Sequence, residues 1–106
     1  MFDSLQMMIE GYVTQLPKGA SRTAYGFPCY FAGERVFGLY DGDALVLKFD
    51  ADKGEQLIAA QFGRHFRHAA TSSGKLWVRI NLARVNSEEV LETLIYESYE
   101  YVIAAA

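Results

Sequence analysis

Apolar side chains recur at three- and four-residue spacing in three stretches of the chain, a pattern typical of helices with one buried face. This pattern predicts helices over about Ser4–Gln15, over Lys53–Phe62, and from Ser87 nearly to the C-terminus. Each predicted start carries an Asp or Asn followed three residues later by Gln or Glu: Asp3 and Gln6, Asp52 and Glu55, Asn86 and Glu89. Such pairs favour a helix start because each side chain satisfies a free backbone N–H group.

Four other stretches have the composition of β-strands: about Thr23–Phe31, Arg35–Tyr40, Ala44–Phe49 and Lys75–Leu82. Gly33-Glu34 and Asp41-Gly42 mark tight turns, so we expect the first three strands to form an antiparallel meander. Pro28 interrupts the first strand and cannot donate to a ladder, so we expect it at an edge or a bulge.

The last predicted strand alternates with a two-residue period. One set of side chains should pack against helices and the other should face away: Leu76, Val78, Ile80 and Leu82 in the first set, Lys75, Trp77, Arg79 and Asn81 in the second. Trp77 would then lie on an open face, shared with Tyr30, Tyr40 and Val46. Such an apolar patch often marks an interface, most simply a homodimer; the alternative is that a loop or a terminus covers it.

The order of elements is helix, three strands, helix, strand, helix. Helices on one face of an antiparallel sheet give a two-layer α+β sandwich. The length of 106 residues fits a single domain spanning residues 1–106, and an apolar share of 51% indicates a globular chain.

Charge and cysteine content narrow the function classes. A net charge of −3 and a pI of about 5.3 argue against a dedicated nucleic-acid-binding protein, which usually has a basic face. One cysteine, Cys29, allows no internal disulfide, which suits a reducing compartment, and we expect a cytoplasmic location. The sequence shows no signal-peptide pattern and no long uncharged apolar stretch, so we expect no membrane partner.

Charged residues are sorted along the chain. The segment 56–87 contains no acidic residue but holds two histidines and five cations, Arg64, Arg67, Lys75, Arg79 and Arg84, whereas the last helix holds five glutamates. One interpretation is a basic surface on which the cations hold phosphates and Trp77 stacks on bases. The other is that the basic segment and the acidic helix neutralise each other within one molecule.

Catalytic and metal-binding candidates are few. Cys29 would act as a nucleophile only if a histidine met it through the fold; otherwise it is a small residue of the sheet core. His65 and His68 have metal-ligand spacing, but no third ligand lies nearby and adjacent arginines repel a cation. We therefore expect no metal and no cofactor.

Several segments resemble known families. The stretch Tyr25-Gly26-Phe27-Pro28-Cys29-Tyr30-Phe31-Ala32-Gly33-Glu34-Arg35-Val36-Phe37-Gly38-Leu39 resembles the opening strands of the TfoX N-terminal domain. Segment 44–50 resembles the next strand of that family and of MmcQ/YjbR-like proteins, and segments 76–80 and 94–99 resemble the YjbR-like ending. The resemblance implies a small α+β fold of the secretion-chaperone-like type, a competence-type regulatory role and suggested DNA binding, with no catalytic residue to transfer.

Three hypotheses follow, in order of preference. The first is a non-catalytic binding module, of the nucleic-acid-associated or regulatory type, that uses Arg64, Arg67, Lys75, Trp77 and Arg79. The alternative is a homodimeric, chaperone-like protein-interaction domain that uses the sheet face. The third is an enzyme that uses Cys29.

Overall fold

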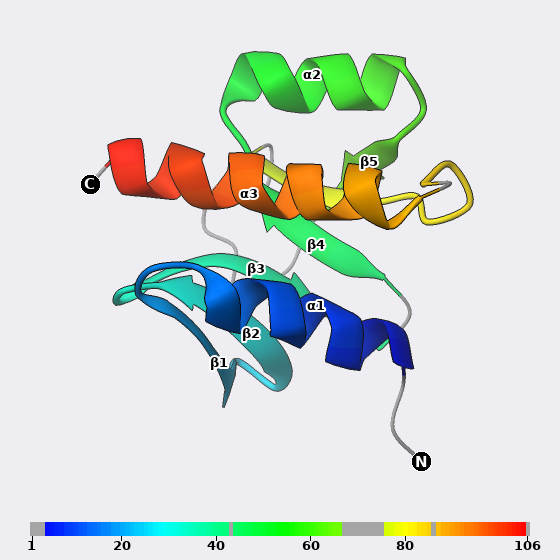
Figure 1. Ribbon diagram of the computed structural model, residues 1–106. Helices are drawn as coiled ribbons and strands as arrows, with labels where there is room; N and C mark the ends of the chain where they lie inside the picture. Colours follow the sequence, from blue (N-terminus) through cyan, green and yellow to red (C-terminus); the bar gives the residue numbers. More distant parts are fainter. Residues whose placement is uncertain (1–3, 43, 67–75, 86, 106) are drawn as a thin grey trace.

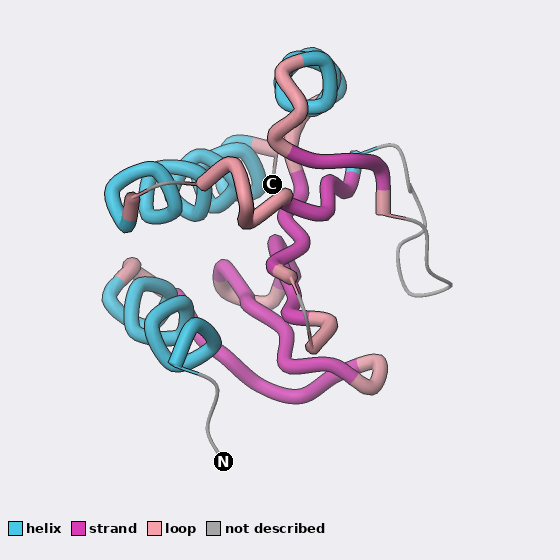
Figure 2. Tube along the Cα trace, turned by 90° about the vertical axis from the view of Figure 1, so that its right-hand side faces the viewer, coloured by secondary structure: helices cyan, strands magenta, loops and turns pink. Residues whose placement is uncertain are grey.

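A computed structural model describes residues 4–42, 44–66, 76–85 and 87–105. The described elements follow the order α1 (Ser4–Gln15), β1 (Gly19–Ala24), β2 (Phe27–Ala32), β3 (Arg35–Tyr40), β4 (Leu45–Lys48), α2 (Ala51–Ala59), β5 (Gly63–His65), β6 (Trp77–Ile80) and α3 (Glu88–Ala104). All paired strands are antiparallel, in the order β1-β2-β3-β4-β6-β5. Helices α1 and α3 lie across one side of this sheet, and α2 lies beyond them near β5 (Figures 1 and 2). The predicted α+β class is confirmed.

Helix starts are set by caps that differ from the predicted ones. Asp50, not Asp52, caps α2, because its carboxylate accepts a hydrogen bond from the Lys53 backbone N–H at 2.8 Å. The helix therefore begins two residues before the predicted start. Ser87 caps α3 in the same way, with its hydroxyl accepting from the Val90 N–H at 3.2 Å. Asp3 and Asn86, two of the expected caps, lie outside the described residues.

The strand prediction for Thr23–Phe31 is wrong in detail, because that segment contains a hairpin. Tyr25 and Gly26 both have positive φ, 56° and 85°, and turn the chain between β1 and β2. Positive φ at both central residues is the geometry of a two-residue hairpin turn. Strand β1 (sequence GASRTA) was missed because it has few apolar residues and no clear alternation. The three-residue β5 likewise lies in a segment for which the sequence predicts no strand.

Pro28 is tolerated because the β2–β3 pairing stops beside it. It lies opposite Thr23 of β1, whereas the register with β3 begins only at Cys29, which lies opposite Leu39. The missing N–H of Pro28 therefore removes no bond between β2 and β3. Although β2 is an inner strand, Pro28 has no partner on its β3 side, so the expected edge position is met locally, and the bulge lies elsewhere.

That bulge is at Phe37. Tyr30 lies opposite Gly38 and Phe31 opposite Val36, so Phe37 has no partner on β2. The extra residue turns the fully buried Phe37 ring into the core beneath the helices. The Ser98 hydroxyl of α3 lies within hydrogen-bond distance of two backbone carbonyls, that of Phe37 at 3.0 Å and that of Lys48 at 2.7 Å. A single buried serine thus joins the main helix to an irregular point of the sheet.

The sheet has a separate apolar cluster on each side. The cluster facing the helices contains the strand residues Tyr30, Phe37, Tyr40, Leu45, Leu47, Val78 and Ile80. The cluster on the second side contains Cys29, Phe31, Leu39, Val46 and Trp77. The predicted sides of Val78 and Trp77 are confirmed. Tyr30 and Tyr40 were placed on the wrong side, and Leu76, which precedes β6, packs with the second cluster.

Candidate binding groove

Trp77 does not lie on an open face. Only 4% of its surface is exposed, and it packs with Cys29, Phe31, Leu39 and Val46 on the second side of the sheet. The ammonium group of Lys48, its cross-strand neighbour, lies 5.9 Å from the indole centroid. The guanidinium of Arg22 covers Phe31 in the same way, at 4.0 Å. Long basic side chains therefore cover the rings of this cluster, and the expectation of an exposed indole free to stack is wrong.

Of the other four predicted site residues, the structure describes two, Arg64 and Arg79. Arg64 of β5 and Arg79 of β6 lie directly opposite each other on the side of the sheet that Val46 faces. Arg64 is exposed, whereas the Arg79 side chain is 25% exposed and its Nε donates to Asp41 Oδ2 at 2.9 Å. Arg67 and Lys75 lie outside the described residues. The structure thus brings together two of the five predicted residues.

Asp41 holds its position for Arg79 through the turn that the sequence predicted. Gly42 has a φ of 100°, as expected for this turn, and Asp41 Oδ1 accepts a hydrogen bond from the Ala44 N–H at 2.9 Å. The second carboxylate oxygen is then directed to Arg79. This ion pair is largely shielded from water, so salt screens it less than an exposed pair.

Cys29 and His65 lie on opposite sides of the sheet. The Cys29 thiol is buried in the second cluster and donates to the Ala24 carbonyl at 3.3 Å, and burial raises its pKa. A raised pKa lowers the thiolate fraction, so the thiol is a poorer nucleophile. His65 points toward α2, where its Nε2 lies 3.4 Å from Glu55. His68 lies outside the described residues, and no group of three metal ligands occurs within the described part of the chain.

The helices carry most of the negative charge. Within α1, α2 and α3 there are eight carboxylates and one basic side chain, Lys53, which leaves a formal charge of −7. Among the described residues, the ion pair made by α3 is Glu97 with Lys53 at 3.2 Å, and none joins α3 to Arg64, Arg79 or Arg84. The predicted neutralisation of the acidic helix by the basic segment therefore does not occur through ion pairs in this part of the structure.

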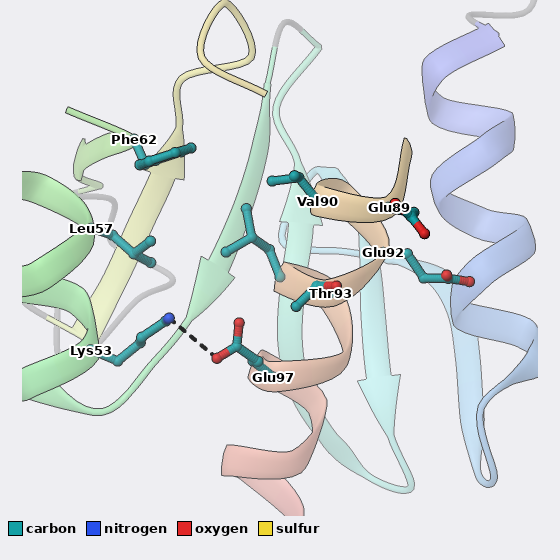
Figure 3. Close-up of a pocket in the computed structure, with 9 residues that line it drawn as sticks. Lys53, Leu57, Phe62, Glu89, Val90, Glu92, Thr93 and Glu97 are labelled. Carbon is teal, nitrogen blue, oxygen red and sulfur yellow. Dashed lines mark ion pairs between the residues drawn. The ribbon is translucent and has the colours of Figure 1, made fainter. Parts of the chain in front are cut away.

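A groove of about 600 Å³ lies between α2 and α3. Apolar side chains of both sides line it, Leu57 and Phe62 from α2 and the residues after it, Val90 and Leu94 from α3. Figure 3 shows Leu57, Phe62 and Val90 directed into the space between the helices, with the Lys53–Glu97 ion pair spanning its lower end. Glu89 and Glu92 project from the other side of α3 (Figure 3). The result is an apolar floor beside an acidic helix.

A second groove of about 420 Å³ runs along the opposite side of α3, against α1. It shares Glu92, Thr93 and Glu97 with the first groove. Tyr96 lines it and is 44% exposed, with its ring stacked on Tyr99 at 6.2 Å. The acidic ridge of α3 is therefore flanked by a hollow on each side.

Sequence reasoning missed the α2–α3 groove. Leu57, Phe62 and Leu94 fit the helical apolar pattern, which predicts core residues; Leu57 and Leu94 are buried in the core, and Phe62 is partly buried against it. Periodicity does not reveal that two helices stand apart. The available signal was the acidic last helix, because glutamates without neighbouring cations suggest a face that is left for something else.

Comparison with known proteins identifies the fold. No protein-family model and no curated protein sequence matches this chain. The crystal structure of Deinococcus radiodurans protein DR2400, described as family-model domain DUF419, is similar with a TM-score of 0.67. The chain has the fold of that protein. The match covers 86% of this chain and 72% of DR2400 at 23% sequence identity, and at this identity the likeness concerns the fold alone.

DUF419 is an MmcQ/YjbR-like family, so the shared fold agrees with that part of the resemblance noted in the sequence. No match supports the TfoX N-terminal part. Within the described residues, no helix combines the length and apolar character needed to cross a bilayer.

Proposed function

We propose that the domain is a non-catalytic binding module that holds a cationic, amphipathic segment of a protein partner in the groove between α2 and α3. The observation that carries this proposal is the combination in one place of an apolar floor and an acidic helix. Phe62 and Val90 offer partly exposed apolar surface above the buried Leu57 and Leu94. Glu97 lies at one end of the groove, and Glu89 and Glu92 border it from the other side of α3. Such a surface is complementary to a segment that carries apolar side chains beside cationic ones.

The charge of the helices supports a cationic partner. With a formal charge of −7 on α1, α2 and α3, an approaching cation is attracted and a phosphate backbone is repelled. Complementary charge mainly raises the association rate and selects the partner, and the apolar floor then slows dissociation. A protein segment with Lys or Arg next to Leu-type residues meets both requirements.

This proposal keeps the protein-interaction hypothesis but moves the site. The sheet side that Trp77 faces is filled by side chains of the same molecule, so it offers no open indole to a second copy. Nucleic-acid binding stays a prediction that depends on Arg64 and Arg79 among the described residues. A regulatory role would be exercised through whichever partner occupies the groove.

The test is peptide binding measured by fluorescence anisotropy. The probe is a labelled peptide with Leu at helical spacing and Lys at the other positions, and a peptide of the same composition in scrambled order is the control. We expect the amphipathic peptide to bind at least about tenfold more tightly, which is about 1.4 kcal/mol. Equal affinity for the two peptides, or no binding of either, would overturn the proposal.

Matched variants locate the site. Glu92→Lys and Glu100→Lys change the net charge equally and lie on the same helix, but of these two only Glu92 borders the α2–α3 groove, and it also borders the groove against α1. We expect E92K to weaken peptide binding at least tenfold more than E100K, because exposed charges are screened beyond about 8 Å at physiological salt. Equal losses for both variants would show general attraction to an acidic protein.

A further inference from the structure

We propose that a phosphate group binds at the β5–β6 end of the sheet, between Arg64 and Arg79. This site is separate from the α2–α3 groove and does not depend on it. Arg64 and Arg79 are directly opposite each other on neighbouring strands, so both start from the same side of the sheet. Like charges in directly opposite positions destabilise a sheet. An anion between them would turn that repulsion into attraction.

Asp41 neutralises only part of this charge. Its carboxylate accepts from the Nε of Arg79, and the two terminal amino groups of Arg79 make no hydrogen bond to a described residue. Arg64 is exposed and has no ion-pair partner within the described residues. Two arginines and one aspartate leave one net positive charge, and several N–H donors point to no described acceptor.

A hollow of about 470 Å³ lies at this end of the sheet. It is lined by both arginines, by the amide side chains Gln61 and Asn81, and by Ile58, Gly63 and Ile80. Two hydrogen bonds hold the Asn81 side chain in place. Its Nδ2 donates to the backbone carbonyl of Gln61 at 3.4 Å, and its Oδ1 accepts from the Ala83 backbone N–H at 3.2 Å. Gln61 has a positive φ of 64°, which fixes the turn that leads into β5.

The lining favours a phosphate over a carboxylate. A guanidinium group presents a planar fork of donors that pairs with two oxygens at once, so one arginine can saturate a carboxylate. Two arginines suit an anion with at least three acceptor oxygens arranged in three dimensions, which is a phosphate group. Free phosphate, a nucleotide and a nucleic-acid backbone all present this group.

Binding of inorganic phosphate, of a nucleoside monophosphate and of a single-stranded oligonucleotide is to be measured by calorimetry at constant ionic strength. We expect saturable binding of at least one of the three, weakened at least about tenfold by Arg64→Gln. Arg84→Gln is the matched control. Arg84 is an exposed arginine that does not line the hollow, and its guanidinium lies over the Phe62 ring. We expect R84Q to change the affinity less than about twofold.

The three probes distinguish the sources of the phosphate. Binding of the small anions alone indicates a small-molecule site. If the oligonucleotide binds, the slope of log affinity against log salt concentration should fall by about one in R64Q. That result indicates that the site holds a nucleic-acid backbone. Absence of saturable binding for all three probes, or an equal loss in R84Q, would overturn the proposal. Peptide binding in the α2–α3 groove should be unchanged in R64Q, so failure here leaves the proposed function standing.

Discussion

The two sides of the sheet are buried by different means. On one side the apolar residues are covered by helices, and the helices carry a formal charge of −7. On the other side, Phe66 and Leu76 pack against a smaller cluster around Trp77, and the charged groups of Lys48 and Arg22 lie over its rings. Since the chain has a net charge of −3, the residues outside the helices carry +4.

This difference separates charge that covers the protein's own surface from charge that is open to a ligand. On the Trp77 side, Lys48 and Arg22 lie over rings and Arg79 pairs with Asp41, so these cations already have roles in the fold. On the helical side, glutamates flank two grooves with apolar walls. An unusual residue such as a lone tryptophan is therefore a weaker guide to a site than unpaired charge beside apolar surface.

The largest loss of stability is expected from removal of the Trp77 ring, on the side of the sheet away from the helices. Trp77→Ala should lower the free energy of unfolding by about 3–5 kcal/mol, because a buried ring is lost and a cavity remains. Urea unfolding followed by circular dichroism measures the change. Met7→Ala, on the helical side and 57% exposed, is the control and should shift stability by less than about 0.5 kcal/mol. A loss below about 1 kcal/mol for W77A would mean that the ring is not enclosed.

The second prediction concerns the thiol of the same cluster. Burial raises the Cys29 pKa in the folded protein, so the folded state binds this proton more tightly than the unfolded state does. Its contribution to stability is present below the unfolded pKa and is lost as pH rises through the higher folded value. At about pH 8, iodoacetamide should label the folded protein at least 100-fold more slowly than the urea-unfolded chain. Rapid labelling of the folded protein would revive the enzyme hypothesis.

A smaller effect is expected where the helical layer meets the sheet. Ser98→Ala removes the only side-chain partner, among the described residues, of the bulged Phe37 carbonyl, and should cost about 1–3 kcal/mol. Thr93→Ala, an exposed position on the same helix, should change stability by less than about 0.5 kcal/mol. If S98A is as stable as T93A, the bulge does not need the helix to hold it.

The smallest change in stability is expected at the ion pair that joins α2 to α3 across the groove. Lys53 and Glu97 are 33% and 42% exposed, so water screens their ion pair. Lys53→Gln should therefore change the free energy of unfolding by less than about 0.5 kcal/mol, measured by urea unfolding. The same change should strengthen binding of the lysine–leucine peptide, because it removes a competing cation from the groove. A stability loss near that of S98A would show that the two helices depend on this pair.

Local patterns predicted the helices, the layered architecture and the side of the sheet that Val78 faces. The helical range Ser4–Gln15 is confirmed because its apolar spacing and the Pro17 stop agree. The pattern failed where local signals compete. Asp50 and Asp52 are both good caps, and the structure uses Asp50, whose backbone is extended at φ −65° and ψ 163°. The bulge at Phe37 depends on pairing with β2, which no local spacing encodes.

The candidate site was less predictable than the fold. The pairing of Arg64 with Arg79 depends on β5, a three-residue strand that carries no periodic signal. Burial of Trp77 follows from side chains of several strands and from Phe66, residues far apart in the sequence. The α2–α3 groove exists because the two helices pack on the sheet without closing against each other, which depends on the whole fold (Figures 1 and 3).

Peptide binding between α2 and α3 can be located by an amide NMR titration of the protein with the lysine–leucine peptide. If the peptide lies between α2 and α3, the amide resonances of Leu57, Val90 and Glu97 shift, while those of Leu39 and Trp77 stay unchanged. Shifts that gather on Leu39 and Trp77 instead, with the α2 and α3 resonances unchanged, would contradict this placement of the peptide.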